Sequence, residues 1–249
     1  MPALTEIERG RKEATHTVVQ PTDVKPYLNP DPDTSIGLRY AFYLLGDVRG
    51  KTVLDLGCGS GENIAPLLAR GARVIAVDLS EELVKLARKR IEITKPFVPP
   101  PLMVGSAYDI ALADESVDAI LCASLLHHLD IPRAMGEMRR LLKPGGFIVV
   151  KEPVRFSKSA ATLRRLFPAQ KDVSEDEHPL TKAELEQVKA GWIVTGERAF
   201  RLPIIALLMK FLSEKRMLRV WPLDGWLLRK FRWLEPFATG RVLKLEKIG

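Results

Sequence analysis

Three glycines at alternate positions, Gly57, Gly59 and Gly61, follow the strand-like run TVLDL and precede a helical pattern. A loop between a parallel strand and the next helix lies at the carboxyl edge of a sheet, where glycines let the backbone approach a ligand closely. The GxGxG spacing differs from the GxGxxG that cradles a pyrophosphate. Asp55 lies two residues ahead of the loop, and its carboxylate suits an amine better than a phosphate.

A second acid, Asp78, closes the next predicted strand, where a carboxylate can accept hydrogen bonds from both hydroxyls of a ribose. Leu79 beside it can pack on an adenine face. Ser106 and Ala107 follow the third predicted strand and are placed to meet the adenine edge. The expected ligand therefore contains an adenosine and an amine-bearing cationic tail without a phosphate, which is the shape of S-adenosylmethionine.

Alternating strand and helix patterns must position these residues. Continuous apolar strands with helical crossovers predict an α/β fold with a doubly wound sheet that is buried on both faces. We expect a short helix at residues 37–46 over the mouth of the domain, a helix capped by Asp130, and a capping-box helix that opens at Thr181. Residues 154–179 are polar and are expected to form a loop or lid. The seven expected strands are TVLDL, RVIAVD, PLMVG, VDAILCAS, FIVVKEP, WIVTGERAF and GRVLKLEKI. The helix capped by Asp130 is expected at 131–142, and two further helices at 62–70 and 81–93.

Four segments in this order resemble the class I S-adenosylmethionine-dependent methyltransferases: VLDLGCGSGEN, Asp78, VGSAYDIALADESVDAILCASLLHHL and LLKPGGFIVV. The similarity covers roughly residues 50–153 and is strongest to the small-molecule branch, which includes quinone, sugar and natural-product methyltransferases. It implies a Rossmann-like sheet of seven strands whose last strand is antiparallel. We expect an N-terminal helical cap at 1–46 and a methyltransferase domain at 47–249, with a helical insertion at about 201–238.

The resemblance and the loop together give an expected site for S-adenosyl-L-methionine, with S-adenosyl-L-homocysteine as the product. Many members of the family carry Asp where Ser106 stands, and the Ser106 hydroxyl is a weaker partner for the adenine amino group. The residues assigned to the cofactor are Asp55, Gly57, Cys58, Gly59, Gly61, Asn63, Asp78, Leu79, Ser106, Ala107 and Ala123.

The histidines that follow the fourth predicted strand, His127 and His128, are candidates for a general base because imidazole titrates near neutral pH. His128 is preferred because it lies nearer to the following helix, and the alternative is that both histidines only line the pocket. Tyr27 is the third catalytic candidate. No acid at this strand end suits a catalytic metal, so we predict none. Further candidates are Arg39, Tyr40, Glu152 and His178.

The formal net charge of +7 is concentrated at the C-terminus, because residues 195–249 contain twelve Lys or Arg and five Asp or Glu. Three tryptophans, Trp221, Trp226 and Trp233, alternate there with cations. Three interpretations stay open: the apolar residues pack on the sheet; they form an apolar acceptor pocket whose outer face contacts an anionic membrane; or the segment binds nucleic acid. We expect nucleic acid to be an unlikely partner. The residues named for packing are Ile204, Leu207, Leu208, Phe211, Trp226, Leu227 and Trp233.

The expected function is methyl transfer to a small, apolar or amphipathic acceptor by in-line displacement. Two alternatives are an RNA or protein methyltransferase that docks through the basic C-terminal region, and a non-catalytic module that keeps the cofactor fold. The polar N-terminus lacks the apolar core of a secretory signal, and no apolar run is long enough to span a membrane, so we expect a cytoplasmic protein. Only Cys58 and Cys122 are present, which excludes a disulfide framework.

Overall fold

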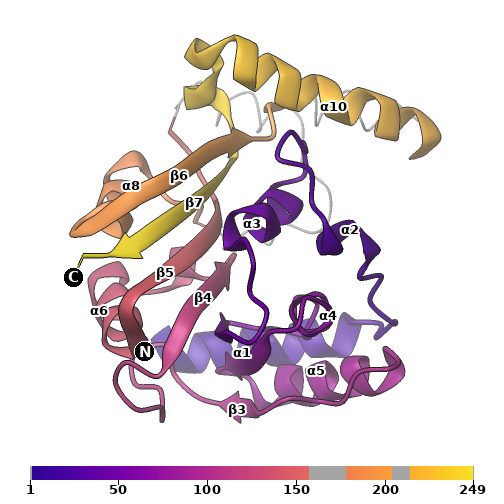
Figure 1. Cartoon of the computed structure of the whole chain (residues 1–249), viewed down its shortest axis with the longest axis vertical. Helices are drawn as coiled ribbons and strands as arrows, with labels where there is room; N and C mark the ends of the chain where they lie inside the picture. The colour runs from indigo at the N-terminus through magenta and orange to yellow at the C-terminus, as the bar shows by residue number, and fades with distance from the viewer. Residues whose placement is uncertain (1, 157–177, 204–213, 249) are drawn as a thin grey trace.

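The protein is described by a computed structural model that covers residues 2–156, 178–203 and 214–248. Its centre is a seven-stranded sheet in the order β3-β2-β1-β4-β5-β7-β6 (Figure 1). The predicted α/β class and the seven strands are confirmed, whereas most of the expected loop at 154–179 lies outside the described residues. The strands are β1 (Thr52–Leu56), β2 (Arg73–Asp78), β3 (Leu102–Val104), β4 (Val117–Ala123), β5 (Leu142–Pro153), β6 (Trp192–Phe200) and β7 (Gly240–Lys247).

Strand direction brings the candidate residues to one edge. β3, β2, β1, β4 and β5 are parallel, and Leu56 of β1 pairs with Val77 of β2 and with Cys122 of β4. The carboxyl ends of these strands therefore lie side by side. The last strand, β7, is antiparallel to both β5 and β6, as predicted. Gly240 at its start pairs with Pro153 and Phe200, so the end of β6 lies at the same edge.

Helices connect the strands, and several begin at side-chain caps. The Asp130 carboxylate accepts a hydrogen bond from Arg133 N, and Thr181 and Glu184 form a capping box, which confirms both predicted helix starts. Two short 3₁₀ helices are η1 (Leu126–His128) and η2 (Arg232–Phe237). The α-helices are α1 (Pro2–His16), α2 (Lys25–Leu28), α3 (Gly37–Leu45), α4 (Ile64–Ala69), α5 (Glu81–Ile93), α6 (Ile131–Leu141), α8 (Lys182–Lys189) and α10 (Glu214–Lys230).

Two elements begin two or more residues away from their predicted starts. The helix expected from residue 62 begins at Ile64, because turns continue through the glycine loop, where Gly61 N donates to Cys58 O. β5 begins at Leu142, directly after α6 and ahead of the glycines expected to separate helix and strand. The reason is that Leu142 already pairs with Val117 of β4, across an irregularity in the ladder.

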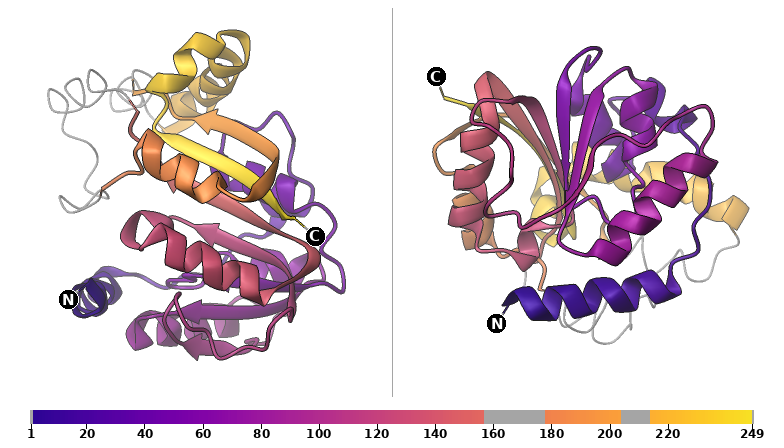
Figure 2. Two further views of the ribbon diagram at one scale, coloured as in Figure 1. Left: turned by 90° about the vertical axis from the view of Figure 1, so that its left-hand side faces the viewer. Right: turned by 90° about the horizontal axis from the view of Figure 1, so that it is seen from below.

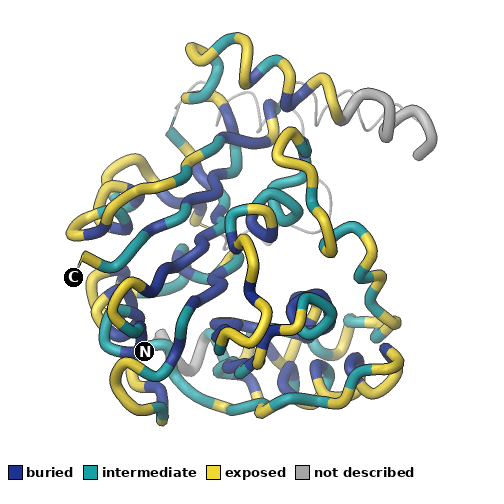
Figure 3. Tube along the Cα trace, viewed as in Figure 1, coloured by how far each residue is buried: buried dark blue, intermediate teal, exposed yellow. Residues whose placement is uncertain are grey.

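The core has two large apolar clusters, one on each face of the sheet, and a small third cluster that includes Ala199 of β6 and Leu228 of α10. On one face, α6 and α8 pack through residues such as Met138 and Leu185. On the other face, α3, α4 and α5 pack through residues such as Phe42, Leu67 and Ile91. The central strands β1, β4 and β5 are correspondingly deeply buried, whereas much of β6 at one edge is exposed (Figure 3). This arrangement leaves the carboxyl edge of the strands as the place where loops meet.

The N-terminal segment is helical, but its two main helices take different places. The expectation that residues 37–46 lie over the mouth of the domain is wrong, because α3 buries Phe42 and Leu45 against a sheet face. It is α1 that lies beside the carboxyl ends of the strands (Figure 2). Arg11 of α1 forms an ion pair with Glu82 of α5 at 3.0 Å, which holds the helix there.

Candidate functional site

The glycine loop is shaped by close packing at two positions. Gly57 has a φ of 70°, and a Cβ there would lie 2.8 Å from Leu125 Cδ2. Gly61 has a φ of 82°, and a Cβ there would lie 2.8 Å from Ala87 Cβ. At Gly59 a Cβ would meet nothing within 4 Å. The loop is therefore clamped at its two ends, while its middle glycine faces open space that a ligand can approach.

The Asp55 carboxylate lies buried directly beneath this loop. Its Oδ1 accepts a hydrogen bond from Asn63 Nδ2 at 3.4 Å, and its Oδ2 is buried without a hydrogen-bond partner. Burial, as the largest cause, raises the pKa of Asp55 to about 7 from 3.8. A buried carboxylate oxygen without a partner is costly unless a donor reaches it. The arrangement suits a ligand that brings a cationic N–H group.

Asp78 is attached to the same loop. Its Oδ2 accepts a hydrogen bond from Gly59 N at 2.8 Å, and its Oδ1 accepts one from Ser80 N at 2.9 Å. Burial, as the largest cause, raises the pKa of Asp78, and the backbone donors oppose that rise. The sheet thus brings both predicted acids to one glycine loop, each with lone pairs left to accept further hydrogen bonds.

The remaining residues assigned to the cofactor lie at the same edge or next to it. Leu79 and Ala107 are half-buried, as is Ala123 at the end of β4. Ser106 Oγ accepts a hydrogen bond from Tyr108 N at 3.2 Å, so its hydroxyl proton stays free to donate. Cys58 is buried, and burial raises its thiol pKa, so this residue serves packing and not nucleophilic chemistry.

His127 and Glu152 form a buried pair next to the glycine loop. His127 Nδ1 lies 2.6 Å from Glu152 Oε2, and the two side chains are 2% and 0% exposed. Glu152 Oε1 accepts hydrogen bonds from the backbone N–H groups of Leu125 and Leu126, both at 2.8 Å. His127 Nε2 is buried without a hydrogen-bond partner. Glu152 therefore fixes the ring, with the proton on Nδ1 and the lone pair on Nε2.

His128 has a different environment. Arg9 Nη1 of α1 lies 2.8 Å from Nδ1 and 2.6 Å from Nε2 of His128. Burial and the neighbouring His127 lower the pKa of His128 to about 3. An imidazole with so low a pKa is a weak base at neutral pH. Arg9 also lies against both ring nitrogens of His128, whereas His127 Nε2 has no partner, so the geometry favours His127, where the sequence ranked His128 first. Arg9 was missed, because no local pattern links residues 119 positions apart.

The other candidates, Tyr27, Tyr40 and His178, each have different neighbours. The ring of Tyr27 packs on Phe42 with centroids 4.8 Å apart, and burial raises its pKa, opposed by Arg39. Tyr40 packs on Phe200 of β6, at 5.4 Å between centroids. His178 is exposed and contributes to lowering the pKa of His128. Among the described residues no group of three His, Cys, Asp or Glu could hold a metal ion, and the predicted lack of a metal stays a prediction.

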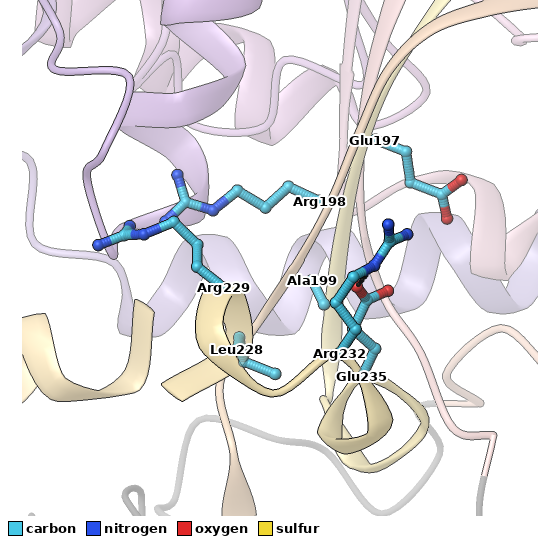
Figure 4. Close-up of a pocket in the computed structure, with 7 residues that line it drawn as sticks. All are labelled: Glu197, Arg198, Ala199, Leu228, Arg229, Arg232 and Glu235. Carbon is cyan, nitrogen blue, oxygen red and sulfur yellow. Dashed lines mark hydrogen bonds and ion pairs between the residues drawn. The ribbon is translucent and has the colours of Figure 1, made fainter. Parts of the chain in front are cut away.

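A cavity of about 310 Å³ lies between β6, α10 and η2. Arg198 and Arg229 extend toward the N-terminal segment, where they donate to the carbonyl oxygens of Pro32 and Asp33, whereas Glu197 points to the other side of β6 (Figure 4). These bonds join β6 and α10 to the turn before α3. Among the helices that the structure describes, none is long and apolar enough to cross a membrane.

Comparison with known families finds a match for the central part of the chain. Residues 54–150 match the family described as a methyltransferase domain, and these residues hold the glycine loop, both acids and the histidine pair. The match agrees with the resemblance to class I S-adenosylmethionine-dependent methyltransferases seen in the sequence.

Among curated proteins, the chain is similar to an uncharacterized methyltransferase of Mycobacterium tuberculosis, with 40% identity over 39% of this chain and 37% of that protein. It is 37% identical to a demethylmenaquinone methyltransferase of Clavibacter sepedonicus, over 42% of each chain. It is 36% identical to a ubiquinone biosynthesis O-methyltransferase of Xanthomonas oryzae, over 49% of this chain and 54% of the relative. The matches thus span from about two fifths to about half of these relatives.

Solved structures share the whole fold at low sequence identity. A geranyl diphosphate C-methyltransferase of Streptomyces coelicolor, solved with S-adenosyl-L-homocysteine, aligns over 99% of this chain and 98% of its own, with a TM-score of 0.63 and 15% identity. The [4+2]-cyclase SpnF aligns over 98% of this chain and 94% of its own, with a TM-score of 0.56 and 19% identity. At this identity the likeness concerns the fold alone, and the activity must be argued from the site.

Proposed function

We propose that the chain binds S-adenosylmethionine at the carboxyl edge of β1, β2 and β4 and transfers its methyl group to a small, apolar or amphipathic acceptor. The observation that carries this proposal is Asp55, a buried carboxylate with one oxygen lacking a partner, beneath a glycine whose surroundings are open. A phosphate ligand would be repelled there, whereas an ammonium group would supply the missing donor.

The residues at this edge fit the parts of that cofactor. In the proposal Asp55 accepts from the ammonium group and Asp78 accepts from the ribose hydroxyls. Leu79, Ser106 and Ala107 border the adenine. Bound S-adenosylmethionine supplies an electrophilic methyl group on a sulfonium, so the protein's own task is to orient the acceptor and exclude water.

We assign the proton acceptor to His127, for acceptors that must lose a proton. Glu152 accepts a hydrogen bond from the Nδ1–H group of His127 and holds the ring, which leaves Nε2 to accept a proton from a substrate hydroxyl or carbon. His128 has the lesser role of lining the site, and Tyr27, which packs on Phe42, has no part in the proposed proton transfer. The assignment of residues 47–249 as one catalytic domain with the insertion at about 201–238 is part of the same proposal.

The acceptor class is supported by the names of similar proteins. One relative is named a demethylmenaquinone methyltransferase and another a ubiquinone biosynthesis O-methyltransferase, and a structural neighbour was solved with geranyl diphosphate. All three names refer to molecules with isoprenoid chains. An apolar or amphipathic acceptor is therefore the proposal for this chain, and peripheral membrane contact is a separate proposal that concerns α10 and η2.

Ligand binding tests the cofactor half of the proposal. S-adenosylmethionine and S-adenosylhomocysteine at a hundred times their Kd should raise the melting temperature by about 5–10 °C, whereas NAD and ATP should not. The matched control is Asn63→Ala, which removes a neighbour of Asp55 but leaves the carboxylate, and which should weaken binding less than Asp55→Asn. A shift with NAD alone would overturn the cofactor assignment.

A labelled-methyl experiment tests the acceptor half. The protein is incubated with methyl-labelled cofactor and a cell extract, which is then divided into lipid, polar-metabolite, RNA and protein fractions. We expect label in the lipid or small-molecule fractions. Label found solely in RNA or protein would favour the alternative of a macromolecular acceptor. Cofactor binding without any transfer would favour a non-methylating use of the fold, an alternative that the likeness to a [4+2]-cyclase suggests.

A further inference from the structure

The segment between β6 and β7 exposes large apolar side chains that the fold does not cover. Leu223, Trp226, Trp233 and Phe237 are 43%, 46%, 69% and 38% exposed, and all four lie within fifteen residues. The tryptophan at the start of β6, Trp192, is buried. Concentrated exposure of large apolar residues marks a surface that is used for contact.

These side chains are joined to one another. Leu223 and Trp226 are three positions apart on α10 and therefore share a helix face. The ring centroids of Trp226 and Phe231 are 6.0 Å apart, and those of Phe231 and Trp233 are 6.5 Å apart. We call the surface formed by Leu223, Trp226, Lys230, Phe231, Arg232 and Trp233 the aromatic–cationic face.

The opposite side of α10 fixes which way this face points. The buried Asp224 carboxylate accepts hydrogen bonds from the backbone N–H groups of Arg201 and Leu202 at 2.9 and 2.7 Å. A Cβ at Gly225 would lie 2.6 Å from Ser35 Oγ, and Leu228 is buried. α10 is thus attached to the domain by one side, and its aromatic–cationic face is turned outward.

The charges on this face are positive. Lys230 Nζ lies 5.8 Å from the centroid of the Trp226 ring, and the Arg232 side chain is 86% exposed. The acid beside them, Glu235, pairs with Arg232 and with the buried Arg241. The same stretch of sequence, residues 195–249, carries the whole excess positive charge of the chain. A partner must therefore offer both an apolar layer and negative charge.

We propose that the aromatic–cationic face docks on the surface of an anionic lipid bilayer. Tryptophan is favoured at the boundary between headgroups and acyl chains, and Lys and Arg beside it are attracted to anionic headgroups. A second copy of the chain would bring like charges together. RNA would leave Leu223 without an apolar partner.

The position of the face agrees with this partner. The end of β6 and the start of β7, between which α10 and η2 lie, pair next to the end of β5 and so are at the same edge of the sheet as the glycine loop. If the proposed function holds, an acceptor dissolved in the bilayer would reach the protein on the side where the cofactor binds. Docking itself does not rest on that function.

Vesicle flotation without cofactor tests the inference. We expect the protein to bind vesicles of phosphatidylcholine mixed with phosphatidylglycerol and to bind pure phosphatidylcholine at least tenfold more weakly, with the difference lost at high salt. Trp226→Ser combined with Trp233→Ser should lower the binding to mixed vesicles at least tenfold. Lys230→Gln and Arg232→Gln should each lower it about fivefold.

Matched controls lie at the far end of the molecule. Val98→Ser removes an apolar side chain that is 77% exposed in the segment before β3, and Lys89→Gln removes an exposed charge of α5. Both variants should bind vesicles as the unchanged protein does. Melting temperatures and circular dichroism check that each variant folds.

Three results would overturn the inference. The first is that the protein binds neutral and anionic vesicles equally, or binds neither. The second is dimerisation in ultracentrifugation that the tryptophan variant abolishes, and the third is tighter binding to RNA than to vesicles. Loss of S-adenosylmethionine binding with vesicle binding intact would instead count against the proposed function alone.

Discussion

The Asp55 carboxyl group couples the proposed cofactor site to pH. Because burial raises its pKa to about 7 from 3.8, the folded chain holds this proton at pH values where the unfolded chain has lost it. Its contribution to stability is therefore full below about pH 4 and is lost as the pH rises through about 7. A bound cation reverses this preference, since it stabilises the ionised carboxylate.

The first prediction is that S-adenosylmethionine binding releases a proton from Asp55 below about pH 7. Affinity should rise from about pH 5.5 to about pH 7 as the carboxyl ionises before binding. Calorimetry in buffers of different ionisation enthalpy measures the release. Asp55→Asn should bind about 10- to 100-fold more weakly and release no proton from this site. If the variant released as many protons on binding, the released proton would come from another group.

The second prediction concerns the pair of His127 and Glu152. In Glu152→Gln, the amide oxygen can still accept from the backbone of Leu125 and Leu126, while its NH₂ group faces His127 Nδ1. That contact favours the tautomer with the proton on Nε2, which then cannot accept one. With an acceptor that must lose a proton, turnover should fall about 10²- to 10⁴-fold while cofactor affinity stays the same. His128→Asn is the control, and it should lower turnover less than Glu152→Gln does. Unchanged turnover in Glu152→Gln would mean that Glu152 only accepts the backbone hydrogen bonds and does not set the tautomer of His127.

At the scale of elements, α1 is placed by very close packing. Gly10 approaches α5 so closely that a Cβ would lie 2.5 Å from Ser80 Cβ. The same placement brings Arg9 to His128. Since its neighbour Arg11 pairs with Glu82 across the same contact, one glycine decides whether the helix can lie beside the candidate site.

The third prediction is that Gly10→Leu detaches α1 from α5. Hydrogen exchange of residues 2–16 should become at least about tenfold faster, while protection in β1 and β4 stays the same. Gly136→Ala is the matched control, because a Cβ at this helical glycine of α6 meets nothing within 4 Å. That change should stabilise the fold by about 0.5–1 kcal/mol. Unchanged exchange in Gly10→Leu would contradict the observed contact.

At the scale of the whole molecule, stability depends on the two layers around the sheet. Leu121 of β4 is fully buried in the cluster beneath α3, α4 and α5. The fourth prediction is that Leu121→Ala lowers the free energy of unfolding by about 2–5 kcal/mol, measured by the urea midpoint with an unchanged m value. Ile193→Ala, at a position of β6 that is 51% exposed, should cost about 0.5 kcal/mol or less. Similar costs at both positions would argue against this layering.

Much of the fold could be predicted from local sequence. Apolar runs such as RVIAVD indicate strands because each buried strand carries its own pattern, and caps such as Asp130 and Thr181 act on N–H groups three residues away. The placement of the N-terminal helices could not be predicted. The apolar spacing of residues 37–45 is the same whether α3 lies on a sheet face or over its edge, so only packing distinguishes the two.

The candidate site divides in the same way. The sequence by itself determined the glycine loop, both acids and the histidine pair, because each lies at or just after the end of its own predicted strand, which is a local property. Only the tertiary structure decided that Asp55 is buried with one oxygen unpartnered, that Glu152 binds His127, and that Arg9 reaches His128. Burial and contacts between distant residues depend on how the helices pack at the sheet edge, which no single segment specifies.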